Sequence, residues 1–192
     1  MTANTPTIKN LATFRMAKVY SAAFHLTTRP EIRPVYPVRP MRIALAADHA
    51  GFELKQQLGA YLARQGHDVV DLGTHSTAPV DYPDSAEAVA QTMFDGHADR
   101  GVIVCGSGAG VSIAASKFPG IRAAVCHDTY TAHQAVEHDD LNVLCIGSRV
   151  VGPALASEIV DTFLKAQFSH EDRHQRRLNK IFAIERRFAV RS

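Results

Sequence analysis

The sequence predicts an α/β protein: a Rossmann-like three-layer αβα sandwich in which helices cover both faces of a five-stranded parallel sheet, with one more helix at the C-terminus. Two observations predict this class. Short apolar runs alternate with amphipathic stretches from residue 41 onward. The segments between them are only a few residues long, which favours parallel strands joined by crossover helices.

Each expected strand is a short run rich in apolar residues. The first reads RIALAA, a continuous run that is typical of a strand covered on both faces. The five expected strands cover 42–47, 67–73, 101–106, 120–128 and 142–149.

The expected helices follow the strands. Within 50–65, apolar side chains recur at near-helical spacing, and Gly66 ends the pattern. These side chains belong to Phe52, Leu54, Leu58, Tyr61 and Leu62. The other expected helices cover 81–96, 109–117, 129–138, 153–167 and 171–189, and the last of them is basic.

Residues 1–40 form a basic, proline-rich extension. They hold six of the chain's 21 Lys and Arg residues but only one of its 19 acidic residues, and four prolines from Pro30 to Pro40 suit an extended linker. We expect this extension either to be a disordered tail or not to be native, in which case Met41 is the true first residue. A basic, acid-poor N-terminus is also typical of transit peptides. Residues 41–192 form the expected functional domain.

The composition argues against several classes of protein. Residues 41–192 are mildly acidic, which disfavours a nucleic-acid partner. No run approaches the roughly 18 apolar residues of a membrane helix. Cys105, Cys126 and Cys145 form no CxxC pair, and their odd number argues against a disulfide scaffold. We therefore expect a reduced, cytoplasmic protein.

The position of the binding site follows from the fold class. In open α/β sheets, ligands bind beyond the carboxyl ends of the strands. The loops expected at that edge are Asp48-His49, Gly73-Thr74, Cys105 to Gly110, His127-Asp128 and Gly147 to Arg149.

The glycine-rich stretch VCGSGAG, residues 104–110, allows several interpretations. Gly106 and Gly108 fit a dinucleotide fingerprint, but Gly110 comes one residue early and Val111 holds the last glycine's place. The stretch also follows the third strand, whereas the fingerprint follows the first. A cradle of backbone N–H groups for a phosphate or an oxyanion fits better, and a tight turn without a ligand stays open.

Cys105 stands at the carboxyl end of the third strand, beside a helix N-terminus whose dipole favours a thiolate. Such a thiolate acts as a nucleophile or a general base. Cys126 and Cys145 are expected to be small buried apolar side chains.

Two histidines and two arginines complete the candidate site. His49 follows Asp48, and His138 is expected at a helix end near the same edge, where it titrates near neutrality or merely caps the helix. Neither belongs to a metal-spaced pair, so no metal is expected. Arg173 and Arg177 share one helix face, and His174 is adjacent. Three donors on one side of a helix suit a phosphate monoester, unless this face is simply solvated.

Six segments together resemble the ribose-5-phosphate isomerase type B family, which the galactose-6-phosphate isomerase subunits share. They occur in family order and span nearly all of 41–188. The segments are ADHAGFELK (47–55), DYPD (81–84), CGSGAGVSIAASK (105–117), GIRAAVC (120–126), NVLCIGSRV (142–150) and RHQRR (173–177).

The resemblance implies a cofactor-free and metal-free aldose–ketose isomerase of a phosphorylated sugar, with ribose 5-phosphate as the expected substrate. Cys105 would be the base that moves a proton between C2 and C1 through a cis-enediolate. Asp48 and His138 would open the furanose ring, with Ser107 nearby. Substrate and phosphate would be bound by the remaining candidates: His49, Gly106, Gly108, Ala109, Gly110, Asp139, Arg149, Arg173 and Arg177.

The resemblance further implies a homodimer or homotetramer whose sites lie between subunits. Some members use a glutamate after the glycine loop as the base; Val111 stands there, so this is the cysteine type. Asp139 replaces a common asparagine, which leaves a tetrose, allose or galactose phosphate open as the substrate. A non-catalytic nucleotide-binding module is the alternative from another class.

Overall fold

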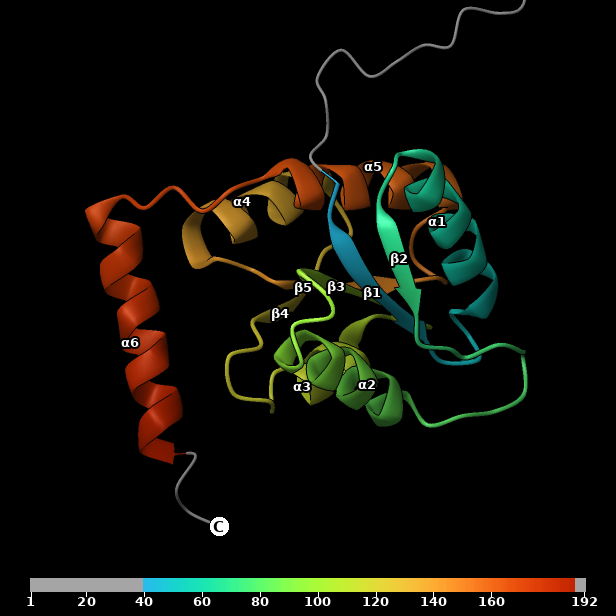
Figure 1. Ribbon diagram of the computed structural model, residues 1–192, viewed down its shortest axis with the longest axis horizontal. Helices are drawn as coiled ribbons and strands as arrows, with labels where there is room; N and C mark the ends of the chain where they lie inside the picture. The colour runs from blue at the N-terminus through green and yellow to red at the C-terminus, as the bar shows by residue number, and fades with distance from the viewer. Residues whose placement is uncertain (1–39, 189–192) are drawn as a thin grey trace, which may run out of the picture. The chain divides into compact units, whose positions relative to one another are not determined.

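The computed structural model describes residues 40–188, and the expectations for residues 1–39 lie outside this range. Strands and helices alternate as expected (Figure 1). The strands are β1 (Arg42–Ala47), β2 (Asp68–Asp71), β3 (Arg100–Cys105), β4 (Ala123–Val125) and β5 (Val143–Gly147). The helices are α1 (Phe52–Arg64), α2 (Tyr82–Phe94), α3 (Ala109–Ala115), α4 (Thr129–Asp139), α5 (Pro153–Lys165) and α6 (Asp172–Phe188).

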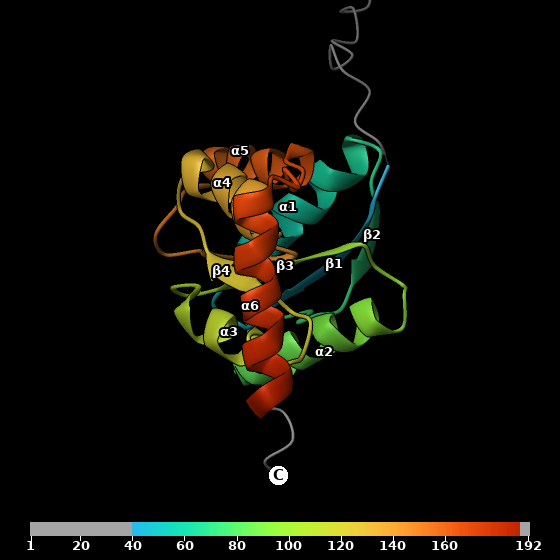
Figure 2. The ribbon, with the colours of Figure 1, turned by 90° about the vertical axis from the view of Figure 1, so that its left-hand side faces the viewer.

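The five strands form one parallel sheet in the order β2-β1-β3-β5-β4. Helices α1, α4 and α5 cover one face, and α2 and α3 cover the other, as Figure 2 shows. The predicted three-layer α/β class is therefore confirmed. All carboxyl ends of the strands lie at one edge of the sheet, and this edge positions the candidate site.

Each face of the sheet has its own apolar core. On one side, Leu58 and Leu62 of α1 pack with Phe163 of α5; on the other, Val89 of α2 packs with Val111 of α3. The central strands β1 and β3 are buried almost throughout, which explains their continuous apolar runs.

β4 is shorter than the expected strand 120–128. The residues before it turn at Gly120, which has a φ of 80°, and the side chain of Asn142 accepts a hydrogen bond from Arg122 N at 2.8 Å. This side-chain bond replaces a ladder bond, so pairing with β5 begins only at Ala123.

Helix α6 lies apart from the two helical layers, in front of the amino ends of the strands (Figures 1 and 2). Contacts with the segment before β4 help to attach it there. Glu185 accepts a hydrogen bond from Gly120 N at 2.8 Å, and the Arg122 guanidinium lies over the Phe182 ring. In residues 40–188, no helix combines the length and the hydropathy needed to cross a membrane.

Candidate active site

The loop from β3 to α3 begins with the candidate base. Cys105 is the last residue of β3 and is only 4% exposed. Gly108 has a φ of 81°, a conformation that favours glycine, and its N–H donates to Cys105 Sγ at 3.0 Å. The loop thus holds the sulfur against a backbone donor, an arrangement that suits a negatively charged sulfur.

The end of β5 supports this loop through its backbone. Ser148 N donates to the carbonyl oxygen of Cys105 at 2.8 Å, and Arg149 N donates to that of Gly106 at 3.1 Å. The Arg149 guanidinium lies beside the loop, because its Cζ is 3.6 Å from the place where a Cβ on Gly106 would stand. A cation therefore lies beside the glycine loop.

Two close backbone contacts fix the base of the site. A Cβ on Gly51 would lie 2.2 Å from the carbonyl oxygen of Val104, and one on Gly147 would lie 2.7 Å from that of Ser107. Neither contact leaves room for a side chain.

Asp48 and Cys105 stand side by side at the carboxyl edge, because Ala47 pairs with Val104 in the register of β1 and β3. Asp48 is 8% exposed and its Oδ1 accepts a hydrogen bond from Gly51 N at 2.9 Å. Next to it, Nδ1 of His49 accepts a hydrogen bond from Val80 N at 3.3 Å.

The remaining loop residues present small groups to solvent. Ser107 and Ala109 are exposed, and Ala109 N donates to Ser107 Oγ at 3.3 Å. Gly110 lies against Tyr82, since an added Cβ would be 2.9 Å from its ring. The structure thus brings together most predicted site residues: Asp48, His49, Cys105, Gly106, Ser107, Gly108, Ala109, Gly110 and Arg149.

His138 and Asp139 do not join this group. Helix α4 starts after the carboxyl end of β4 and ends just before the amino end of β5, so its last residues lie at the opposite edge of the sheet. The expectation that His138 lies near the same edge as Cys105 is wrong within one chain. The helix had to run back along the sheet, which carries its C-terminus to the other side.

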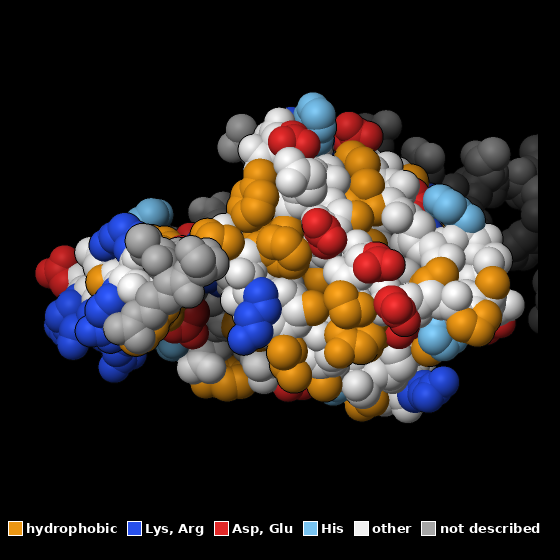
Figure 3. Space-filling model, turned by 90° about the horizontal axis from the view of Figure 1, so that it is seen from below, with side chains coloured by type: hydrophobic (Ala, Val, Ile, Leu, Met, Phe, Trp, Pro, Cys, Tyr) orange, Lys and Arg blue, Asp and Glu red, His pale blue; other side chains and the backbone are white. Residues whose placement is uncertain are grey.

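Arg173 and Arg177 also lie away from the glycine loop. Both are exposed on α6, which is attached at the amino edge of the sheet, and Arg173 Nε donates to Glu171 Oε2 at 2.8 Å. Figure 3 shows Lys and Arg side chains gathered on this helix, at the left of the view. The predicted site is therefore divided into two groups at opposite edges.

The sequence places His174 beside Arg173 and Arg177 as a third donor on one side of the helix, but the structure buries its ring. It is 1% exposed, its ring stacks on that of His138 with 4.0 Å between centroids, and its Nδ1 lies 2.6 Å from Ser169 Oγ. Burial lowers the pKa of His174, and His138 and Arg173 lower it further.

His127 was placed at the carboxyl edge by the sequence but given no role. Its Nε2 accepts a hydrogen bond from Gly147 N at 3.0 Å. The only signal was its position directly after the fourth strand.

The other two cysteines are buried apolar residues, as expected. Burial raises the pKa of Cys126 to about 11 and raises that of Cys145 further still. Neither side chain is therefore a thiolate near neutral pH, and neither can act as the base. Across residues 40–188, no group of three or more His, Cys, Asp and Glu side chains is arranged to hold a metal ion.

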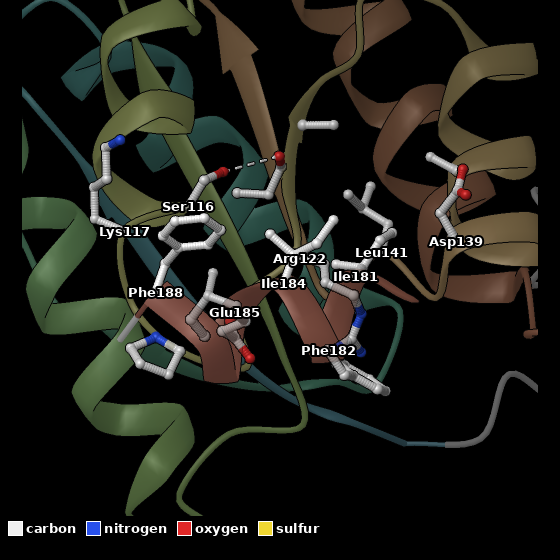
Figure 4. Close-up of a pocket in the computed structure, with 15 residues that line it drawn as sticks. Ser116, Lys117, Arg122, Asp139, Leu141, Ile181, Phe182, Ile184, Glu185 and Phe188 are labelled. Atoms are coloured by element: carbon white, nitrogen blue, oxygen red, sulfur yellow. Dashed lines mark hydrogen bonds between the residues drawn. The ribbon is translucent and has the colours of Figure 1, made fainter. Parts of the chain in front are cut away.

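A cavity of about 890 Å³ lies between α6 and the body of the protein. Figure 4 shows Ile181, Ile184 and Phe188 of α6 along it, with Asp139 at one end. Its lining includes no residue of the glycine loop. Of the predicted site residues, only Asp139 lines it.

Known proteins match most of the chain. The model of the Ribose/Galactose Isomerase family matches residues 43–181. Ribose-5-phosphate isomerase B of Escherichia coli is 49% identical over 146 residues, which cover 76% of this chain and 97% of that protein. D-erythrulose-4-phosphate isomerase of Pectobacterium atrosepticum is 42% identical over 130 residues, which cover 67% and 85% of the two chains.

Solved structures agree in fold. The structure of ribose-5-phosphate isomerase B from Clostridium thermocellum has a TM-score of 0.75 at 48% identity and covers 77% of this chain and 99% of that one. These matches support the isomerase interpretation over the nucleotide-binding module. The chain belongs to the Ribose/Galactose Isomerase family and is an aldose–ketose isomerase.

Proposed function

We propose that this protein interconverts ribose 5-phosphate and ribulose 5-phosphate. The observation that carries the proposal is the placement of Cys105 Sγ beside Asp48, at the start of a glycine loop whose Gly108 N–H it accepts, in a chain of this family. A proton transfer between neighbouring carbons needs a base at one carbon and a donor for the oxygen that becomes negative.

The proposed reaction begins with opening of the sugar ring, in which Asp48 takes part. The Cys105 thiolate then removes the proton from C2, the electron pair forms the C1–C2 double bond, and negative charge moves to O1. Backbone N–H groups of residues 107–110 stabilise this charge. A proton passes from O2 to O1, and the thiol returns its proton to C1, which leaves a ketone at C2.

The phosphate requires positive groups, and the structure divides these between two edges. His49 and Arg149 stand near the glycine loop, whereas His138, Arg173 and Arg177 stand at the amino edge. We infer that a second copy of the chain supplies the latter group together with Asp139, so that the complete site lies between subunits of a homodimer or homotetramer.

The surface supports this assembly. Ile181, Ile184 and Phe188 leave α6 with exposed apolar side chains, and Ile113 and Tyr82 do the same over α3 and α2, where Figure 3 shows apolar patches. Contiguous exposed apolar surface of this kind is typical of protein–protein contacts. The free cysteines fit the reduced cytoplasm that we infer as its location.

A substrate panel tests the proposed function. Purified protein without added metal is given ribose 5-phosphate, erythrose 4-phosphate, allose 6-phosphate and galactose 6-phosphate, and ketose formation is measured. We expect the largest kcat/KM with ribose 5-phosphate. A larger value with erythrose 4-phosphate would make the tetrose phosphate the substrate, as the similarity to D-erythrulose-4-phosphate isomerase allows.

We also propose that residues 1–40 are dispensable, so a chain that begins at Met41 keeps this turnover.

A further inference from the structure

His127 occupies a specific place behind the glycine loop. Gly147 ends β5, and Ser148 and Arg149 follow it. Each of the three donates its backbone N–H to a residue at or just after the end of a neighbouring strand. Ser148 and Arg149 donate to carbonyl oxygens of the loop, as described above. Gly147 instead donates to the side chain of His127, at 3.0 Å from Nε2.

Gly147 transmits this anchor to the loop. Its Cα stands so close to Ser107 that an added Cβ would be 2.7 Å from the Ser107 carbonyl group. Its nitrogen lies 3.2 Å from the place of a Cβ on Gly108. A shift of the Gly147 peptide therefore displaces Ser107 and Gly108, and Gly108 is the residue whose N–H holds Cys105 Sγ.

The hydrogen bond also defines the state of the histidine ring. Nε2 accepts only when it carries no hydrogen, so the neutral ring has its proton on Nδ1. A glutamine at this position places an acceptor oxygen at a similar reach, whereas an asparagine is one carbon shorter and a methionine has no strong acceptor.

We propose that His127 is a positioning residue for the isomerisation: through Gly147 it fixes the glycine loop in the form that holds Cys105, and it does not touch the sugar. The proposal rests on the role given to Cys105 under the proposed function. It explains why a half-buried histidine stands at the carboxyl edge with its Nε2 directed at the backbone.

The test compares His127→Met, His127→Gln and His127→Asn with the parent chain. Four quantities are measured: kcat and KM with ribose 5-phosphate, the melting temperature, and the rate of amide hydrogen exchange in the peptide that contains residues 104–110. His133→Met is the control, because His133 is an exposed histidine on α4.

We expect His127→Met and His127→Asn to lower kcat by about 10-fold to 100-fold, the effect of a small misplacement of a catalytic group, with KM changed less than about twofold. Exchange in 104–110 becomes faster in both. His127→Gln restores most of kcat and the slow exchange, and His133→Met changes neither.

Three results would overturn the proposal: unchanged kcat in His127→Met, equal losses in the Met and Gln variants, or a loss confined to KM, which would place the ring on the substrate. The exchange measurement needs no turnover, so it separates this proposal from the proposed function. If Cys105→Ala keeps full activity, Cys105 is not the base. The rate of amide hydrogen exchange in residues 104–110 then still shows whether His127 anchors the loop.

Discussion

The rings of His138 and His174 stack with 4.0 Å between their centroids and join the end of α4 to the start of α6. His174 is buried in this contact and hydrogen-bonded by Ser169 at 2.6 Å. The stack fixes the position of Arg173 and Arg177 relative to the body of the chain. It also makes the attachment of α6 sensitive to protons.

The pH dependence of stability tests this contact. Burial lowers the pKa of His174, so the unfolded chain binds the proton more readily than the folded chain. The contribution is complete above the ordinary histidine pKa of about 6.5 and is lost as the pH falls below it. We expect the melting temperature to fall between about pH 7.5 and about pH 5.5, and His174→Gln to reduce this slope.

His67 adds a contribution of the same sign, because burial also lowers its pKa. His174→Gln therefore removes only part of the dependence of the melting temperature on pH. Exposed His133 is the control, and His133→Gln should leave the slope as it is. An unchanged slope in His174→Gln would show that the stack does not sense protons.

Replacement of the proposed base tests the chemistry. Cys105→Ala removes the group that takes the C2 proton, and we expect kcat to fall by at least about 100-fold, the contribution of a positioned general base. Cys126→Ala is the matched control, since Cys126 is buried and its pKa is raised to about 11. Its turnover should be that of the parent chain; similar activity in both variants would remove Cys105 from the mechanism.

Mixing of two inactive variants tests the shared site. Cys105→Ala damages the group at the carboxyl edge, and Arg177→Ala damages the group on α6. If two chains build each site, a refolded mixture forms hybrid dimers in which one site is intact, and activity returns to about a quarter of the parent value. A mixture as inactive as its components would place the whole site within one chain.

The buried ion pair of Lys55 and Asp71 predicts an asymmetric effect on stability. Lys55 is fully buried, whereas Asp71 is partly exposed. Burial alone would raise the pKa of Asp71, but hydrogen bonds from Lys55 and Gly73 lower it overall. Asp71→Asn leaves a buried ammonium without its charged partner, at a cost of about 3 kcal/mol.

Lys55→Met is the matched variant, because it removes the buried charge and leaves Asp71 partly in water. We expect it to cost clearly less than Asp71→Asn in the free energy of unfolding measured with urea. Equal losses would mean that the ammonium is hydrated in the folded protein.

The sequence predicted the part of the site that follows from strand order. Asp48 follows the apolar run of the first strand, and Cys105 ends that of the third. Parallel pairing of these two strands alone places both residues side by side. His138 was misplaced because its distance along the chain from the fifth strand is short, whereas the helix carrying it runs opposite to the strands. The stacking of His174 and the bond from Gly147 to His127 depend on tertiary packing, for which a single sequence has no periodic signal.

The close contacts of Gly51 and Gly147 limit how this enzyme can be redesigned. A side chain at either position would overlap the backbone at the base of the glycine loop, at 2.2 Å and 2.7 Å. A library that aims at a longer or shorter sugar should therefore leave both glycines unvaried. It should vary the rim instead, where Val80 is exposed, and keep Arg149 for the phosphate.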